Sequence, residues 1–132
     1  MNMNDRVFQK IDGTKIPDVI EYIKNHMQKF PTRTFNIYVG CDSQQLKKYT
    51  SYATAIVIHR VGKGAHVIYC RNRVKRINDF FTRMWGEVEN GIQVSCMLKD
   101  SLAVNITNAI EVHFDFNVLP PVSYTHLTLP TK

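Results

Sequence analysis

Apolar residues near the start of the chain recur at helical spacing. Between Lys15 and Phe30 they are separated by three or four positions, which is typical of one buried face of a helix. They are Ile16, Val19, Ile20, Ile23 and Met27. Thr14 can cap the start, Pro17 is tolerated in a first helical turn, and Pro31 would end the helix. The pattern predicts a helix over 15–30 that covers a core with one apolar face.

Strand-like segments follow, rich in β-branched and aromatic residues. They span 35–41, 49–60 and 65–74. Gly62 and Gly64 favour a tight connection between the second and third segments. Strands joined by short connections normally pair antiparallel, so these segments predict an antiparallel meander.

The longest helical pattern covers residues 78–102, with Asn78 as a plausible cap. Its expected buried stripe consists of Phe81, Met84, Trp85, Val88, Ile92, Ser95 and Leu102. A fourth strand is expected over 109–116. After a helical crossover, this strand is expected to lie parallel to the first strand. The order of elements predicts an α/β fold with a mixed sheet of three antiparallel strands plus a parallel strand, and flanking helices.

Composition is ordinary for a globular protein. The chain has 132 residues, of which 44% are hydrophobic and 21% charged, and this length fits a single domain. It contains no apolar run of the roughly 18 residues that a membrane span needs, and its polar N-terminus does not resemble a signal peptide. The three cysteines, Cys41, Cys70 and Cys96, lack disulfide or zinc spacing. We therefore expect buried, reduced thiols in a cytoplasmic protein without membrane contacts.

A formal net charge of +6 favours a phosphate-bearing partner. Basic residues gather near the end of the third strand and after the first strand. They are Arg71, Arg73, Lys75, Arg76, Lys47 and Lys48. This group predicts a surface that binds nucleic-acid phosphates. A solvated strand edge whose charges discourage aggregation remains the alternative interpretation.

Three carboxylates have positions that suggest chemistry. Asp42 is expected at the end of the first strand, with space beside it at Gly40. Glu87 borders the buried stripe of the long helix, and Asp115 lies between two phenylalanines near the end of the fourth strand. Each has an ordinary alternative, since Asp commonly caps turns and a helical Glu is commonly solvated.

The same three carboxylates are more informative together. Parallel neighbouring strands would bring Asp42 and Asp115 to one sheet edge, and the long helix could add Glu87. Carboxylates that cluster raise one another's pKa, so such a cluster implies a bound cation. Oxygen ligands favour Mg²⁺ or Mn²⁺ over zinc. Two such ions can promote phosphodiester cleavage.

The motifs around these residues resemble one family. They are YVGCDSQ at 38–44, YATAIV at 52–57, RMWGEV at 83–88 and EVHFDFN at 111–117. In this order they resemble the YkuK-type ribonuclease H-like family over roughly residues 15–117. The resemblance implies a ribonuclease H-like fold and, by analogy, metal-dependent hydrolysis of nucleic acid with Asp42, Glu87 and Asp115 as metal ligands.

The end of the chain departs from that family. A further strand and a C-terminal helix carrying a fourth acidic or His residue would be expected, and nothing after Asn117 matches them. We expect a single domain over 1–119, incomplete at its C-terminus, and an artefactual or disordered tail over 120–132, which resembles translated sequencing-adapter text.

Three functions remain open. The first is a metal-dependent nuclease acting on RNA, an RNA/DNA hybrid or structured DNA, although activity of this chain is conditional on the missing part. The second is a non-catalytic nucleic-acid-binding module, and the third is a protein-interaction domain. The oligomeric state is left open.

Overall fold

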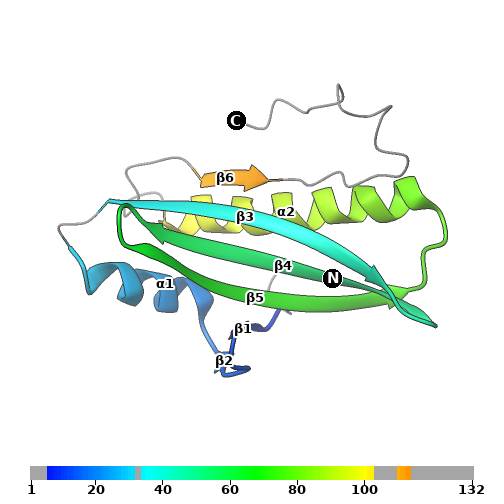
Figure 1. The fold of residues 1–132 in the computed structure, drawn as a ribbon, viewed down its shortest axis with the longest axis horizontal. Coiled ribbons are helices and arrows are strands. Elements are labelled where there is room, and N and C mark those ends of the chain that lie inside the picture. Colours follow the sequence, from blue (N-terminus) through cyan, green and yellow to red (C-terminus); the bar gives the residue numbers. More distant parts are fainter. Residues whose placement is uncertain (1–5, 32–33, 103–109, 114–132) are drawn as a thin grey trace.

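A computed structural model describes residues 6–31, 34–102 and 110–113 (Figure 1). The elements in chain order are β1 (Phe8–Lys10), β2 (Lys15–Ile16), α1 (Val19–Gln28), β3 (Phe35–Gln45), β4 (Tyr49–Arg60), β5 (Gly64–Lys75), α2 (Phe80–Leu102) and β6 (Ile110–His113). Asp115 and the predicted tail over 120–132 lie outside the described residues. None of the helices in the described part is long and apolar enough to cross a membrane.

The described strands form one mixed sheet in the order β2-β1-β5-β4-β3-β6. β3, β4 and β5 pair antiparallel, and β6 pairs parallel with β3. Both relationships were predicted from the sequence, and the structure confirms them. The sheet is larger than predicted, because β1 adds to the free edge of β5 and β2 adds to β1.

Both helices cover the same face of the sheet. Residues directly opposite one another in neighbouring strands point to the same side, which places Ser43 and His66 on one face. Ser43 contacts Glu87 from α2, and His66 contacts Tyr22 from α1. One continuous core forms beneath the helices. Its fully buried members include Ile23, Ile37, Val39, Ile56, Ile58, Ile68, Val94, Leu98 and Leu102.

The first helix begins later than predicted. Asp18 caps it, because its Oδ1 accepts a hydrogen bond from the backbone N–H of Glu21 at 3.1 Å. Ile16 pairs with Phe8 in the sheet and is only 5% exposed. The predictions of a cap at Thr14 and of Pro17 inside the first turn were therefore wrong, because strand pairing holds the preceding residues in an extended conformation.

The predicted buried stripe of the long helix is confirmed at Val88, Ser95 and Leu102 but was wrong at three other positions. Phe81 is 64% exposed, Trp85 63% and Ile92 46%. The buried positions are Val88, Asn90, Gly91, Val94, Ser95, Leu98 and Leu102. The helix is turned because Tyr52 lies beneath its start, where the Tyr52 hydroxyl donates to the Arg83 carbonyl at 3.0 Å. Asp79 rather than Asn78 caps α2, since its carboxylate accepts from the Thr82 N–H at 2.8 Å.

Candidate metal and nucleic-acid site

Glu87 reaches from α2 onto β3. Its Oε2 accepts a hydrogen bond from the Ser43 backbone N–H at 3.1 Å and another from the Ser43 hydroxyl. Ser43 lies on the face that α2 covers, and the helix passes over β3 and β4 at this point. The prediction that Glu87 borders the buried side of its helix is therefore confirmed.

Asp42 immediately precedes Ser43 and is exposed. Its Oδ1 accepts from the same Ser43 N–H at 3.0 Å. Two carboxylate oxygens thus share one amide, so they lie no further apart than the sum of the two hydrogen-bond distances, about 6 Å. Asp42 does not end its strand as predicted, because β3 continues to Gln45 and Asp42 pairs with Ala53.

The pKa of Glu87 is raised above its usual value, first by partial burial and then by the negative charge of Asp42. The hydrogen bonds from Ser43 and the nearby Arg83 guanidinium oppose this shift. A half-buried carboxylate beside a second one is stabilised in its charged form by a cation. The local electrostatics therefore favour cation binding.

The donor types at this point fit a hard divalent cation, since Asp42 and Glu87 both offer carboxylate oxygens. Among the described residues, no three His, Cys, Asp or Glu side chains lie close enough together to hold a metal ion. Asp115 lies outside that part of the chain. β6 pairs with β3 in parallel register, with His113 opposite Gly40.

The basic residues separate into two groups. Arg71 and Arg73 are exposed on β5, and their guanidinium groups lie over the Tyr69 and Tyr49 rings at 5.4 Å and 5.6 Å. Arg71, Ala53 and Asp42 form one cross-strand row, so Arg71 and Asp42 belong to the same face of the sheet. This face is opposite the one that the helices cover.

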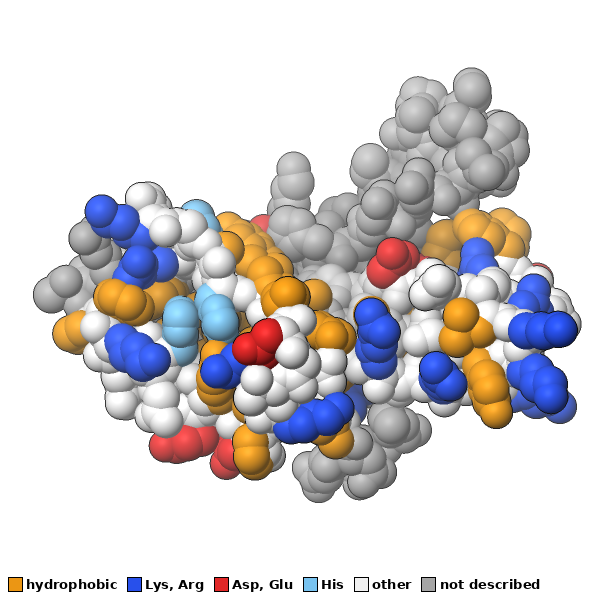
Figure 2. Space-filling view, turned by 60° about the horizontal axis from the view of Figure 1, so that its bottom comes forward, with side chains coloured by type: hydrophobic (Ala, Val, Ile, Leu, Met, Phe, Trp, Pro, Cys, Tyr) orange, Lys and Arg blue, Asp and Glu red, His pale blue; other side chains and the backbone are white. Residues whose placement is uncertain are grey.

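The second group lies where the β3–β4 connection meets the end of β5. Arg76 donates from its backbone to the Lys48 carbonyl at 3.3 Å and from its side chain to the Leu46 carbonyl. Lys47 and Lys48 are exposed beside it, as is Lys75. Figure 2 shows Lys and Arg side chains gathered at this end of the molecule. The structure thus brings together basic residues that are distant in sequence.

The described cysteines are all free. Cys41 and Cys70 are buried, and burial raises the pKa of the Cys41 thiol to about 12, which makes it a poor nucleophile. Cys96 is exposed, so the prediction that it is buried was wrong. It lies on the solvent side of α2, next to the buried Ser95.

Sequence reasoning missed the role of Ser43. A Ser directly after a strand Asp is a weak signal, and nothing local shows that a helix 44 positions later in sequence supplies its partner. The contact depends on how α2 is rotated over the sheet, and this rotation is a property of the packed structure.

The mixed sheet and the helix that crosses it are consistent with a ribonuclease H-like fold. Residues 18–121 match the family described as "Ribonuclease H-like", which is well over half of the chain. The chain therefore belongs to the ribonuclease H-like family. This membership points to a nuclease-like or nucleic-acid-binding module on a fold that typically depends on divalent metal.

One similar curated protein is the Bacillus subtilis (strain 168) protein named "Uncharacterized protein YkuK". It is 44% identical over 48 residues, which are 36% of this chain and 28% of that relative. The aligned segment thus spans less than a third of the relative's length. No solved structure matches the chain significantly.

Proposed function

We propose that this chain is a divalent-metal-dependent nuclease module that hydrolyses phosphodiester bonds in RNA, an RNA/DNA hybrid or structured DNA. Asp42, Glu87 and Asp115 would hold Mg²⁺ or Mn²⁺. The observation that carries the proposal is the convergence of the Asp42 and Glu87 carboxylates on the single amide of Ser43. A like-charged pair held this close is costly unless a cation joins it.

The register of the sheet supports a role for Asp115. β6 runs parallel to β3 with His113 opposite Gly40. Asp115 follows His113 by two residues, just as Asp42 follows Gly40 by two. If the pairing continued, the two aspartates would occupy equivalent positions on adjacent strands, which is the arrangement that the proposal requires.

In this proposal, separate groups of residues orient the metal ligands and bind the nucleic-acid phosphates. Ser43 orients Glu87 by donating two hydrogen bonds to one of its oxygens. Arg71, Arg73 and the basic group around Arg76 would hold backbone phosphates. When bound, the metal would supply Lewis-acid stabilisation of phosphoryl charge and activation of water.

Titration with Mg²⁺ and Mn²⁺ tests the metal site directly. Calorimetry or NMR should show millimolar or tighter binding to the unaltered chain and at least tenfold weaker binding to Asp42→Asn and Glu87→Gln. Asp100→Asn is the matched control, because Asp100 is an exposed carboxylate near the end of the same helix and should leave metal binding unchanged. Equal binding by all of these proteins would refute the metal site.

A nuclease assay then tests the chemistry. Single-stranded RNA, an RNA/DNA hybrid and branched DNA are incubated with each protein at fixed metal concentration. We expect cleavage that requires metal and is lost in Asp42→Asn and Glu87→Gln but kept in Asp100→Asn. Cleavage that persists in both carboxylate variants or in excess chelator would contradict the proposal.

A non-catalytic nucleic-acid-binding module is the second candidate. The basic group around Arg76 and the arginines above Tyr69 and Tyr49 favour it, because they do not depend on the carboxylates. This function predicts salt-sensitive binding that survives Asp42→Asn and Glu87→Gln without metal-dependent cleavage. The same variants therefore separate the two candidates.

A further inference from the structure

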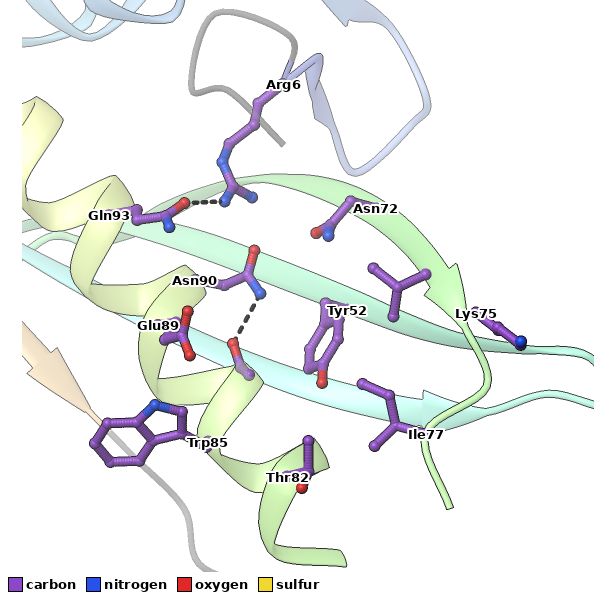
Figure 3. A pocket seen from close by; sticks show the side chains of 12 residues that line it. Arg6, Tyr52, Asn72, Lys75, Ile77, Thr82, Trp85, Glu89, Asn90 and Gln93 are labelled. Carbon is purple, nitrogen blue, oxygen red and sulfur yellow. Dashed lines mark hydrogen bonds between the residues drawn. The ribbon is translucent and has the colours of Figure 1, made fainter. Parts of the chain in front are cut away.

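A cavity of about 400 Å³ lies between the start of α2 and the strands β4 and β5. Its volume is within the range of small-molecule binding sites, which run from about 300 to 1,000 Å³. Figure 3 shows Arg6 from the N-terminal segment, Asn72 and Tyr52 from the sheet and Asn90 from the helix directed toward it. They include the amides Asn72, Asn90 and Gln93, the charged residues Arg6, Lys75 and Glu89, and the rings of Tyr52 and Trp85.

Asn72 gives this cavity an unmet hydrogen-bonding requirement. Its side chain is only 9% exposed, and its buried Oδ1 has no hydrogen-bond partner in the described part of the chain. Figure 3 shows the amide directed into the space between β5 and α2. A buried acceptor without a donor is unfavourable, so a ligand that donates at this point would remove the penalty.

The neighbouring amides are held in defined orientations. Asn90 is 8% exposed and donates from Nδ2 to the Gly86 carbonyl at 2.8 Å. Gln93 accepts from the Arg6 guanidinium at 2.8 Å through Oε1. The cavity is therefore walled by oriented amide groups, while its full charges lie on Arg6, Lys75 and Glu89. Such a wall suits an uncharged ligand with both donors and acceptors along its edge.

We propose that this cavity binds a nucleobase, with the attached phosphate at the rim near the exposed positive charge of Lys75. Amide side chains recognise base edges because each presents a donor and an acceptor side by side. Trp85 is among the residues that line the cavity and is 63% exposed, so its fluorescence can report on an occupant. The proposal rests on and deepens the nucleic-acid function proposed above, because it assigns a base-binding subsite that includes Gly86, the residue before Glu87.

The helix links this subsite to the metal site. Trp85 and Gly86 line the cavity, and the next residue, Glu87, turns to Ser43 on β3. A base in the cavity would hold its sugar and phosphate within reach of the same helical turn. The base can come from a free nucleotide or from a nucleic-acid strand, and the chemistry of recognition is the same in both cases.

Tryptophan fluorescence provides a direct test, since Trp85 is the single tryptophan of the chain. AMP, GMP, CMP and UMP are titrated separately in the presence of chelator, with amide NMR shifts as a second readout. We expect saturable binding of at least one nucleotide that is weakened tenfold or more by Asn72→Leu. The variant should fold with equal or higher thermal stability, because it removes an unpaired buried polar group.

Asn25→Leu is the matched control, since Asn25 is an exposed residue of α1 and should bind as the unaltered chain does. Absence of saturable binding of all four nucleotides by both readouts would overturn the proposal. Equal affinity of the unaltered chain and Asn72→Leu would also overturn it, because the ligand would then bind elsewhere.

Two further arms separate this proposal from the metal site. Glu87→Gln should keep nucleotide binding while it weakens metal binding. Nucleotide binding by an unaltered chain that binds neither Mg²⁺ nor Mn²⁺ would refute the proposed nuclease alone. Short single-stranded RNA and DNA then compete with the bound nucleotide. If an oligonucleotide displaces the bound nucleotide at a concentration tenfold lower than free nucleotide does, the base comes from a strand. If it needs an equal or higher concentration, the ligand is a free nucleotide.

Discussion

Gly86→Ala tests how α2 packs on the sheet. A Cβ atom at Gly86 would lie 2.5 Å from Cζ of Tyr52 and closer still to its hydroxyl oxygen. Contacts this short do not occur, so the ring or the helix must move. Tyr52 has little freedom to move, because it is 2% exposed and its hydroxyl donates to the Arg83 carbonyl.

The expected loss of stability follows from three opposing effects. Replacing Gly by Ala within a helix normally stabilises by about 1 kcal/mol. Overpacking a filled interior costs about 1–3 kcal/mol, and losing the Tyr52–Arg83 hydrogen bond costs about 1 kcal/mol more. The sum predicts that Gly86→Ala lowers the free energy of unfolding by roughly 1–3 kcal/mol.

Urea denaturation of Gly86→Ala, Tyr52→Phe and the double variant measures this. Tyr52→Phe removes the atom nearest the new methyl group, so Gly86→Ala should cost less in that background, with a coupling that exceeds the experimental error. An increase in stability of about 1 kcal/mol on Gly86→Ala, the value for an open helix position, would refute the packing of α2 on Tyr52.

Three further predictions follow from the charged groups. The pKa of Glu87 is raised in the folded state, so ionisation of this carboxyl destabilises the fold as pH rises above about 4.5. At pH 7 without metal, Glu87→Gln should therefore melt at a higher temperature than the unaltered chain. The difference between the two melting temperatures should shrink toward pH 4. Burial lowers the pKa of His26 and of His66, whose rings stack with centroids 4.7 Å apart. As pH drops below 6.5 the unfolded state is protonated first, so the stability of the folded state should fall. Replacing both residues by Gln should reduce this fall in thermal melts. Binding of nucleic acid is measured at several salt concentrations, and log affinity is plotted against log salt concentration. Replacing Arg71 and Arg73 by Gln should reduce the steepness of this line by about 0.7–0.9 for each phosphate that is no longer neutralised. An unchanged slope would exclude both arginines from the interface.

The order of elements was readable from the sequence because it rests on local chemistry. The alternation of apolar residues over 35–41 and 49–60 sets which side of each strand is buried, and the short connection at Gly62 dictates an antiparallel partner. The helical crossover that follows predicts that β6 lies parallel to β3. The same topology places the first long strand beside the long helix, and for this reason the sequence could suggest Asp42 and Glu87 as neighbours.

The rotation of α2 was decided only by tertiary packing. Large apolar residues lie on two sides of this helix. Because Phe81 and Trp85 are apolar, the sequence pattern predicted that their side is buried, but both are exposed. Tyr52, whose ring fits only against a residue without a side chain, turns Gly86 toward the sheet. That rotation also brings Glu87 to Ser43 and leaves the cavity beside Asn72. A helix can satisfy its backbone hydrogen bonds at any rotation about its axis, so only contacts between residues distant in sequence select one.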